Sequence, residues 1–196
     1  KRQLLFRRLA SVPPSQYRPY RVDEDLVPEM ALAGAGYSVR MTSLTHDELG
    51  RAVTDTATQA VLVPRLLRKV YEHREVYEQY ELRHAKDAEV LVVAYGITGR
   101  SAMGAVEAAR ARGIRAGLFR PKTVWPFPGD ALLRAARTVR RVVVAEVNMG
   151  QVALEVERLL AGKCTVVRVT SPGGEVLAPE LILEACAPDR APKVRR

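Results

Sequence analysis

The feature that most constrains this chain is the alternation, from residue 88 onward, of short apolar runs with segments of helical period. The apolar runs occupy Ala88–Tyr95, Ile114–Phe119, Arg141–Glu146 and Thr165–Val169. The segments that follow them predict helices at 101–112, 129–139, 150–160 and 178–186. Continuous apolar strands separated by helices pair in parallel and need cover on both faces of the sheet. The alternation therefore predicts an α/β fold, a three-layer αβα sandwich with a mostly parallel sheet and an antiparallel edge strand.

The beginning of the chain lacks this alternation. Residues 11–36 are rich in proline, glycine and charge, and their apolar side chains follow no period, which predicts an arm that lies along a partner surface. Residues 37–44 predict a short strand, and residues 45–51 a polar turn. Apolar and aromatic residues recur near helical spacing from Thr56 to about Leu82 and predict a long helix. This helix begins near Val63 or kinks at Pro64. We expect an arm at 1–36, a folded domain at 37–187 and a basic tail at 188–196.

The charge pattern does not favour binding to nucleic acid. The chain has 196 residues and a net charge of +9, and its basic residues gather at the two ends or mix with glutamates along the helices. A nucleic-acid surface needs a basic stripe interleaved with exposed aromatic residues, which we do not find. No apolar stretch reaches the roughly 18 residues of a membrane span, and the basic start does not resemble a signal peptide. We therefore expect a cytoplasmic protein without a membrane partner.

The cysteines restrict the chemistry of this chain. Cys164 and Cys186 stand far apart, and no C-x-x-C pair occurs. An iron–sulfur cluster or zinc site built from this chain alone is therefore excluded, and two reduced thiols are the expectation. The first residue is lysine instead of methionine, which predicts a piece of a longer protein. We expect no metal site here and place any missing chemistry outside this segment.

Ligands of a parallel sheet bind at the carboxyl ends of its strands, so the loops there are the candidate sites. The loop after the first apolar run contains Gly96, Thr98, Gly99 and Ser101, and these glycines and hydroxyls suit a backbone cradle for an anion. The loop matches neither of the usual glycine-rich nucleotide-binding motifs. The alternative is a tight turn between strand and helix, with Ser101 as the N-cap.

The next two loops carry aromatic, acidic and amide side chains. Trp125 and Phe127 stand between prolines that restrict the backbone, which predicts either a rigid interface loop or two core residues at the sheet's edge. Glu146, Asn148 and Gln151 stand where a strand enters a helix. Polar groups in that position either orient a ligand or cap the helix and hold a neighbouring loop.

A third polar group is the run His46–Asp47–Glu48. The two acids could orient the imidazole of His46 or raise its pKa. No nucleophile accompanies the histidine in sequence. The run therefore favours a turn or a subunit contact over a catalytic base, and we expect no catalytic residue on this chain.

Four blocks of the sequence carry a family resemblance. Residues 42–50 read T-S-L-T-H-D-E-L-G, followed by V-V-A-Y-G at 92–96, W-P-F-P at 125–128 and E-V-N-M-G-Q at 146–151. In order and spacing they resemble the T-G-x-x-H-D-E-x-G, V-V-A-Y-G, W-P-F-P and E-x-N-x-G-Q blocks of α subunits of 2-oxoacid:ferredoxin oxidoreductases, the 2-oxoglutarate type in particular. Ser43 replaces the usual glycine. The resemblance covers roughly residues 17–186.

The resemblance implies the C-terminal, transketolase-C-like domain of such an α subunit. The whole enzyme would decarboxylate a 2-oxoacid on thiamine diphosphate, pass electrons through iron–sulfur clusters to ferredoxin and form an acyl-CoA. The thiamine motif G-D-G followed by N is absent here, since the only Gly-Asp pair is Gly129–Asp130. Thiamine diphosphate, magnesium and the clusters would then lie elsewhere in the holoenzyme, and the partners would be the β subunit and the rest of the α subunit.

The expected role of this chain is therefore scaffold and subunit interface. The candidate interface residues are His46, Asp47, Glu48, Trp125, Phe127, Asn148 and Gln151. One alternative is the equivalent domain of another thiamine enzyme, of the transketolase or pyruvate dehydrogenase β type. Another is a stand-alone ligand-binding module that uses the loop at 96–101.

Overall fold

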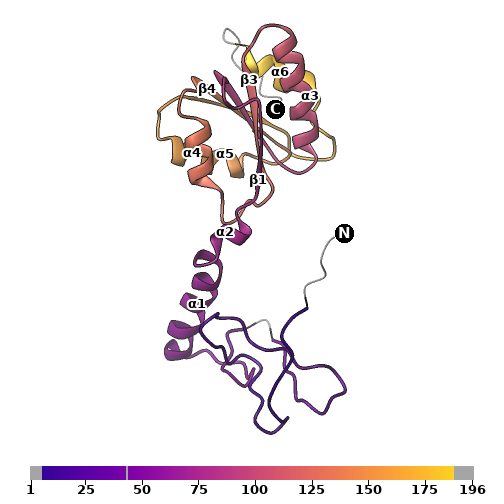
Figure 1. Cartoon of the computed structure of the whole chain (residues 1–196), viewed down its shortest axis with the longest axis vertical. Helices are drawn as coiled ribbons and strands as arrows, with labels where there is room; N and C mark the ends of the chain where they lie inside the picture. Colours follow the sequence, from indigo (N-terminus) through magenta and orange to yellow (C-terminus); the bar gives the residue numbers. More distant parts are fainter. Residues whose placement is uncertain (1–5, 43, 188–196) are drawn as a thin grey trace. The chain divides into compact units, whose positions relative to one another are not determined.

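The computed structural model describes residues 6–42 and 44–187 and divides the chain into two compact units, with the boundary between Arg74 and Glu75. The expected basic tail at 188–196 and Ser43 lie outside the described residues. The domain boundary expected after residue 36 stays a prediction. The two units are described separately below, and their elements can be followed in Figure 1.

The second unit is built on one five-stranded sheet. Its strands are β1 (Tyr80–Arg83), β2 (Val90–Ala94), β3 (Ala116–Pro121), β4 (Arg141–Glu146) and β5 (Thr165–Thr170). Their order in the sheet is β1-β3-β2-β4-β5, and β1 runs antiparallel to β3 while the other neighbours are parallel. The predicted mostly parallel sheet with an antiparallel edge strand is confirmed.

Helices cover both faces of this sheet (Figure 1). Helices α3 (Thr98–Ala111) and α6 (Pro179–Cys186) pack on one face, and α4 (Gly129–Ala135) and α5 (Gln151–Leu160) on the other. Successive side chains of a strand point to opposite faces. Along β2, Val92 and Ala94 accordingly join the core under α3 and α6, whereas Leu91 and Val93 join the core under α4 and α5. The three-layer αβα sandwich is therefore confirmed.

The end of α3 follows from one glycine. Gly113 has φ +79°, a left-handed conformation that residues with a side chain adopt at a cost. Its N–H donates to the Arg110 carbonyl at 2.9 Å, and the Ile114 N–H donates to the Ala109 carbonyl at 3.0 Å. This pair of bonds is the Schellman motif, which satisfies carbonyls that the helix leaves open. The helix predicted at 101–112 thus ends at Ala111, one residue before its predicted end.

The start of α3 differs from the expectation. The helix begins at Thr98, its N-cap is Ile97, and no side chain caps it. Ser101 lies inside the first turns and is buried, so the prediction of Ser101 as N-cap was wrong. The apolar character of Ile97 conceals the helix start, because sequence reasoning looks for a polar N-cap.

The connections place a topological switch point between β2 and β4. The chain leaves β2 into α3 on one face of the sheet and leaves β4 into α5 on the other face. Since these strands are neighbours, their outgoing loops diverge at the carboxyl edge. In open α/β sheets, the crevice at such a point is where ligands bind.

The first unit contains α1 (Thr56–Tyr71), whose start is set by Asp55. The Asp55 carboxylate accepts the backbone N–H of Thr58 at 2.8 Å, which makes it the N-cap. Pro64 lies inside α1, so the helix does not begin near Val63. Helix α2 (Arg74–Tyr77) is a single turn that follows α1.

The expectation of one helix up to about Leu82 was wrong. Tyr80–Arg83 form β1 instead, paired with the edge of β3, and the Tyr80 ring stacks on Phe119 at 5.5 Å between centroids. Tyr77 and Tyr80 have the spacing of a helix in the sequence. The pairing of Tyr80–Arg83 with β3 and the contact of Tyr80 with Phe119 stabilise a strand there instead.

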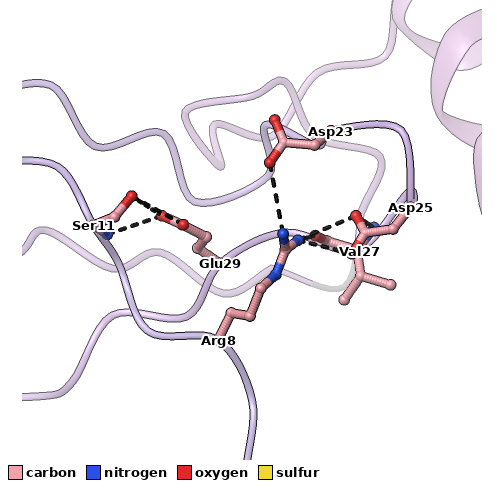
Figure 2. A network of polar contacts seen from close by, with 6 residues as sticks. All are labelled: Arg8, Ser11, Asp23, Asp25, Val27 and Glu29. Carbon is pink, nitrogen blue, oxygen red and sulfur yellow. Dashed lines mark hydrogen bonds and ion pairs between the residues drawn. The ribbon is translucent and has the colours of Figure 1, made fainter.

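The arm forms its own polar contacts, which Figure 2 shows. One Arg8 nitrogen, Nη2, donates to Asp25 at 3.1 Å and to the Val27 carbonyl at 2.8 Å. The Ser11 N–H and hydroxyl both donate to the Glu29 carboxylate, at 2.9 and 3.0 Å. The arm is thus folded back on itself without regular secondary structure.

Residues 37–42, expected to form a strand, form none. The side chain of Tyr37 bonds within the arm instead: its hydroxyl donates to the Val12 carbonyl at 2.9 Å, and its ring packs edge-on against Tyr17. The buried Tyr17 hydroxyl accepts the Ala31 N–H and donates to the Glu29 carbonyl. Tyrosine hydroxyls thus take the place of a strand ladder.

The arm is expected to respond to acid. The N–H and hydroxyl of Ser11 hold the pKa of the Glu29 carboxyl below its usual value of 4.5. Because this pKa is lower in the folded state, the Ser11 contacts stabilise the arm above about pH 4.5 and are lost as the pH falls through the folded pKa. In a carboxyl-detected NMR titration, Ser11→Ala should move the Glu29 pKa toward 4.5. Ser15→Ala is the control, and identical Glu29 curves for both variants would contradict the account.

Candidate functional site

The switch-point crevice between β2 and β4 is occupied by side chains of the protein itself. Tyr95 follows β2, and Glu146 ends β4. The Tyr95 hydroxyl donates to Glu146 Oε2 at 3.3 Å, and the Asn148 side-chain amide donates to the Tyr95 hydroxyl at 2.7 Å. These three polar side chains bond to one another across the place where a ligand would enter.

The Glu146 carboxylate is buried, with an exposed fraction of 1%. Its Oε2 accepts the backbone N–H of Val152 at 3.0 Å, and its Oε1 accepts that of Ala153 at 2.9 Å. These are N–H groups in the first turn of α5, which have no partner inside the helix. A negative charge at a helix N-terminus is also favourable. Glu146 thus supplies the cap that α5 lacks, because the N-cap position is Gly150.

Asn148 completes the cap. Its Oδ1 accepts the N–H of Gly150 at 2.8 Å and that of Gln151 at 3.2 Å. With the two bonds to Glu146, all N–H groups from Gly150 to Ala153 have side-chain acceptors. Gly150 has φ +101°, and an added Cβ would meet Arg168 Nη1 at 3.3 Å, so glycine is required here. The E-x-N-x-G-Q block is therefore a capping device, one of the two alternatives that the sequence left open.

The Tyr95 phenol serves as a donor in this network. Burial and the neighbouring Glu146 carboxylate raise the pKa of Tyr95 above its usual value of 10. The phenol therefore keeps its proton at neutral pH and holds β2 to the β4–α5 loop. The Gln151 side chain is exposed, and only its backbone joins the network.

The candidate anion loop after β2 is mostly buried. Thr98, Gly99 and Ser101 are buried, and Gly96 alone of the four predicted residues is exposed. The Arg120 side chain lies against Gly99, where an added Cβ would be 2.6 Å from its Nε. Arg120 Nη2 donates to the Gly96 carbonyl at 3.3 Å. Because Gly99 has no side chain, the Arg120 side chain of β3 can lie against it. Anion binding by this loop stays a prediction.

The two aromatic residues of the loop after β3 lie in different environments. Phe127 packs on the core beside Phe119, at 6.4 Å between ring centroids. Trp125 has an exposed fraction of 55%. The sequence left core and interface open for both residues, and the structure gives Phe127 to the core and leaves Trp125 accessible.

Sequence reasoning named Trp125 but missed the other exposed apolar side chains along this edge. The loops after β2, β3, β4 and β5 each present at least one, namely Ile97, Val124, Trp125, Met149 and Val176. Met149 is the most exposed of them at 73%. Ile97, Trp125 and Met149 stand next to a glycine or proline, and Val124 and Val176 stand two residues from one, which is the signal that could have found them. We call these residues the apolar rim.

The His46 loop belongs to the first unit. The ring of His46 stacks on Tyr20 at 3.6 Å between centroids, and one Asp47 oxygen accepts the N–H groups of Leu49 and Arg51, both at 2.9 Å. The predicted polar turn is therefore confirmed. The carboxylate of Asp47 orders this turn and does not contact the imidazole through a described hydrogen bond.

His46, Asp47 and Glu48 line a pocket of about 370 Å³ together with residues of the arm and of α1. This pocket lies wholly within the first unit, so it is separate from the network around Glu146. Of the predicted residues, His46, Asp47 and Glu48 line this pocket, Asn148 belongs to the Tyr95–Glu146 network, and Trp125 lies on the apolar rim.

The residues present do not fit an iron–sulfur cluster, which is held by four ligands, mostly thiolates. Cys164 stands just before β5, while Cys186 is buried at the end of α6, and burial raises the pKa of Cys186 to about 11. Across residues 6–42 and 44–187, no group of three or more His, Cys, Asp or Glu side chains is placed to hold a metal ion. Within the same residues, no helix is both long and apolar enough to cross a membrane.

Comparison with known sequences gives a consistent set of relatives. Residues 88–182 match the family described as pyruvate:ferredoxin oxidoreductase core domain II. The chain is 39% identical over 178 residues to the 2-oxoglutarate synthase subunit KorA of Methanothermobacter thermautotrophicus, covering 90% of this chain and 47% of that subunit. It is 38% identical over 116 residues to the ketoisovalerate oxidoreductase subunit VorB of the same organism, covering 59% of this chain and 32% of the relative. The chain thus spans about half the length of KorA.

A solved structure supports the fold. The 2-oxoglutarate:ferredoxin oxidoreductase of Magnetococcus marinus superimposes with a TM-score of 0.72 and 22% identity, over 92% of this chain and 32% of that one. That enzyme was solved with 2-oxoglutarate, coenzyme A and succinyl-CoA bound. At this identity the likeness shows a shared fold.

The cap predicts a large effect of one substitution. Glu146→Ala leaves the buried N–H groups of Val152 and Ala153 without acceptors, at about 1–3 kcal/mol each. We expect the free energy of unfolding in urea to fall by about 2–5 kcal/mol, and by less for Glu146→Gln, which keeps one acceptor oxygen. Tyr95→Phe should cost about 1 kcal/mol.

The control for this experiment is Glu155→Ala, on the same helix. Glu155 forms a surface ion pair with Arg158, so its loss should change stability by no more than about 0.5 kcal/mol. Equal effects of Glu146→Ala and Glu155→Ala would show that the cap does not stabilise this edge.

Proposed function

We propose that this chain, whose residues 88–182 match the family described as pyruvate:ferredoxin oxidoreductase core domain II, serves as the C-terminal domain of the α subunit of a 2-oxoacid:ferredoxin oxidoreductase. Its proposed role is to brace the enzyme and contact neighbouring subunits. Catalysis then belongs to other parts of the complex. The identity to KorA over 90% of this chain supports 2-oxoglutarate as the proposed substrate of the whole enzyme.

This proposal rests on the side chains at the carboxyl edge of the sheet, where polar groups point inward and apolar groups are exposed. Ligand sites in α/β sheets present polar groups outward at the switch point. Here Glu146 and Asn148 point inward and hold backbone N–H groups, while Trp125 and Met149 are exposed. An edge whose polar groups are already hydrogen-bonded and whose apolar side chains are exposed is better suited to contact another protein than to bind a small polar ligand.

The cofactors are proposed for the holoenzyme and not for this chain. Thiamine diphosphate with magnesium, and at least one iron–sulfur cluster, are what this family of reactions requires. The described residues offer neither a cysteine cluster nor an open switch point for them. Coenzyme A and ferredoxin would likewise act through the assembled enzyme, which we propose to be cytoplasmic.

The proposed contacts lie in two places, one in each unit. In the second unit they are Trp125 and its neighbours on the apolar rim. In the first unit they are His46, Asp47 and Glu48 around the pocket. Phe127 and Asn148 would act indirectly, because they hold their loops in place. The partners are the remainder of the α subunit and a β subunit.

Trp125→Ala should reduce assembly of the α subunit with the β subunit. Interface anchors of this kind lose about 2 kcal/mol or more on truncation, which weakens subunit affinity about thirtyfold. His46→Ala should have a smaller effect in the same direction. Subunit affinity is measured by analytical size exclusion over a dilution series, and specific activity is measured on the assembled fraction, where we expect little change.

The matched controls are Leu154→Ala and His73→Ala. Leu154 has an exposed fraction of 58%, close to that of Trp125, but lies on α5 and is not part of the apolar rim. Both controls should assemble normally. Normal assembly of Trp125→Ala or His46→Ala, combined with activity reduced a hundredfold or more, would assign the residue to chemistry and refute the scaffold role.

A further inference from the structure

The pocket of the first unit has a volume and a lining that the scaffold role does not explain. It has a volume of about 370 Å³ and an open mouth, and three segments line it: the arm, the His46 loop and the first half of α1. The lining residues are Tyr20, Val22, His46, Asp47, Glu48, Ala57, Thr58, Val61, Leu62 and Arg65. This volume lies within the range of small-ligand sites, about 300–1,000 Å³.

Arg65 is the charged group that defines the pocket. It is half-buried in α1, and its Nη1 donates to the Leu26 carbonyl at 3.3 Å. Within the described residues it forms no ion pair with a carboxylate. Loss of water around the guanidinium lowers the pKa of Arg65, although the group remains charged. A partly desolvated cation without a counter-charge is unfavourable, and a bound anion would relieve it.

The acidic groups of the pocket do not fill this role. One Asp47 oxygen is committed to the N–H groups of Leu49 and Arg51. The Glu48 side chain is exposed, and its backbone carbonyl accepts the Tyr20 N–H at 3.1 Å. Glu48 forms no ion pair with Arg65 among the described residues, and its charge opposes an incoming anion. Removing that charge therefore provides a direct test.

The rest of the wall is apolar or aromatic. Leu62 is buried, and Val61 and Ala57 are exposed along the same side of α1. The Tyr20 ring is fixed by its stacking on His46 and by its hydroxyl, which donates to the Arg40 carbonyl at 3.0 Å. A ligand therefore meets the Arg65 guanidinium, the acidic residues Asp47 and Glu48, and an otherwise largely apolar and aromatic surface.

We propose that this pocket binds a carboxylate carried on a short apolar stem, with the carboxylate on Arg65 and the stem against Val61, Leu62 and the Tyr20–His46 stack. The proposal concerns the same pocket around which His46, Asp47 and Glu48 were proposed above as contacts. It adds a ligand for Arg65 that does not require the contact role. The same chemistry is offered by a free small acid or by a carboxylate of another protein chain. The following experiment separates these sources.

The test uses three probes on the purified chain: phenylacetate, acetate and 2-phenylethylamine. Phenylacetate has both the charge and the stem, acetate lacks the stem, and the amine reverses the charge. Side-chain NMR signals of Arg65 Nε–H and His46 report binding. We expect phenylacetate to bind with a Kd on the order of millimolar, as its size allows, and the other two to bind at least tenfold more weakly. Equal binding of all three probes overturns the proposal.

Two variants give the sign of the charge effect. Arg65→Gln should weaken phenylacetate binding at least tenfold, whereas Glu48→Gln, which removes the opposing charge, should tighten it severalfold. The control is Arg68→Gln, one turn along α1, because Arg68 pairs with Glu72 at 2.7 Å and does not line the pocket. If Arg65→Gln does not fold, the Glu48→Gln result decides. Unchanged affinity in Arg65→Gln, or in Glu48→Gln, refutes the site.

The source of the carboxylate is found by repeating the titration on the assembled enzyme. If a partner chain supplies the carboxylate, phenylacetate that binds the free chain will no longer shift Arg65 in the complex. If the natural ligand is a free acid, binding persists in the complex and still depends on Arg65. Binding in the complex that is insensitive to Arg65→Gln contradicts the proposal.

Discussion

The buried carboxylate of Glu146 is the interaction on which the carboxyl edge of the sheet depends. A charge with an exposed fraction of 1% is tolerated only when its oxygens are hydrogen-bonded, and the first turn of α5 supplies the donors. Gly150 has no side chain to cap that turn, so Glu146 provides the acceptors for its N–H groups. The same N–H groups stabilise the buried charge of Glu146. Tyr95 and Asn148 join the same carboxylate to the end of β2. One charge thus fixes a helix, a loop and a neighbouring strand.

This arrangement uses the place where an α/β sheet usually binds its ligand. The network joins the end of β2 to the loop between β4 and α5, and Ile97, Trp125 and Met149 are exposed at the same edge. Rigid apolar tips lose little conformational freedom when a partner covers them, which favours a permanent subunit contact. This arrangement is what the proposed bracing role requires of the carboxyl edge.

Most of the second unit could be predicted from sequence, because strands buried on both faces must read as unbroken apolar runs. The Tyr80–Arg83 strand could not, since its pairing with β3 is a tertiary contact that local spacing does not encode. The arm was predicted only as irregular, because its order comes from side-chain contacts such as Ser11 with Glu29. At the site, the sequence identified Asn148 but left its role open, because cap and ligand contact require the same residue types. The pocket around Arg65 joins three separated segments, which no local pattern reveals.

Hydrogen–deuterium exchange of the chain, free and within the assembled enzyme, tests the central claim most directly. If the carboxyl edge is a contact surface, assembly should slow exchange of the loop amides at 96–97, 122–127 and 173–177. The amides of Val152 and Ala153 should already be protected in the free chain, because Glu146 and the helix hold them. Exchange in these loops that ignores assembly but slows on addition of thiamine diphosphate or coenzyme A would contradict the account and make the edge a ligand site.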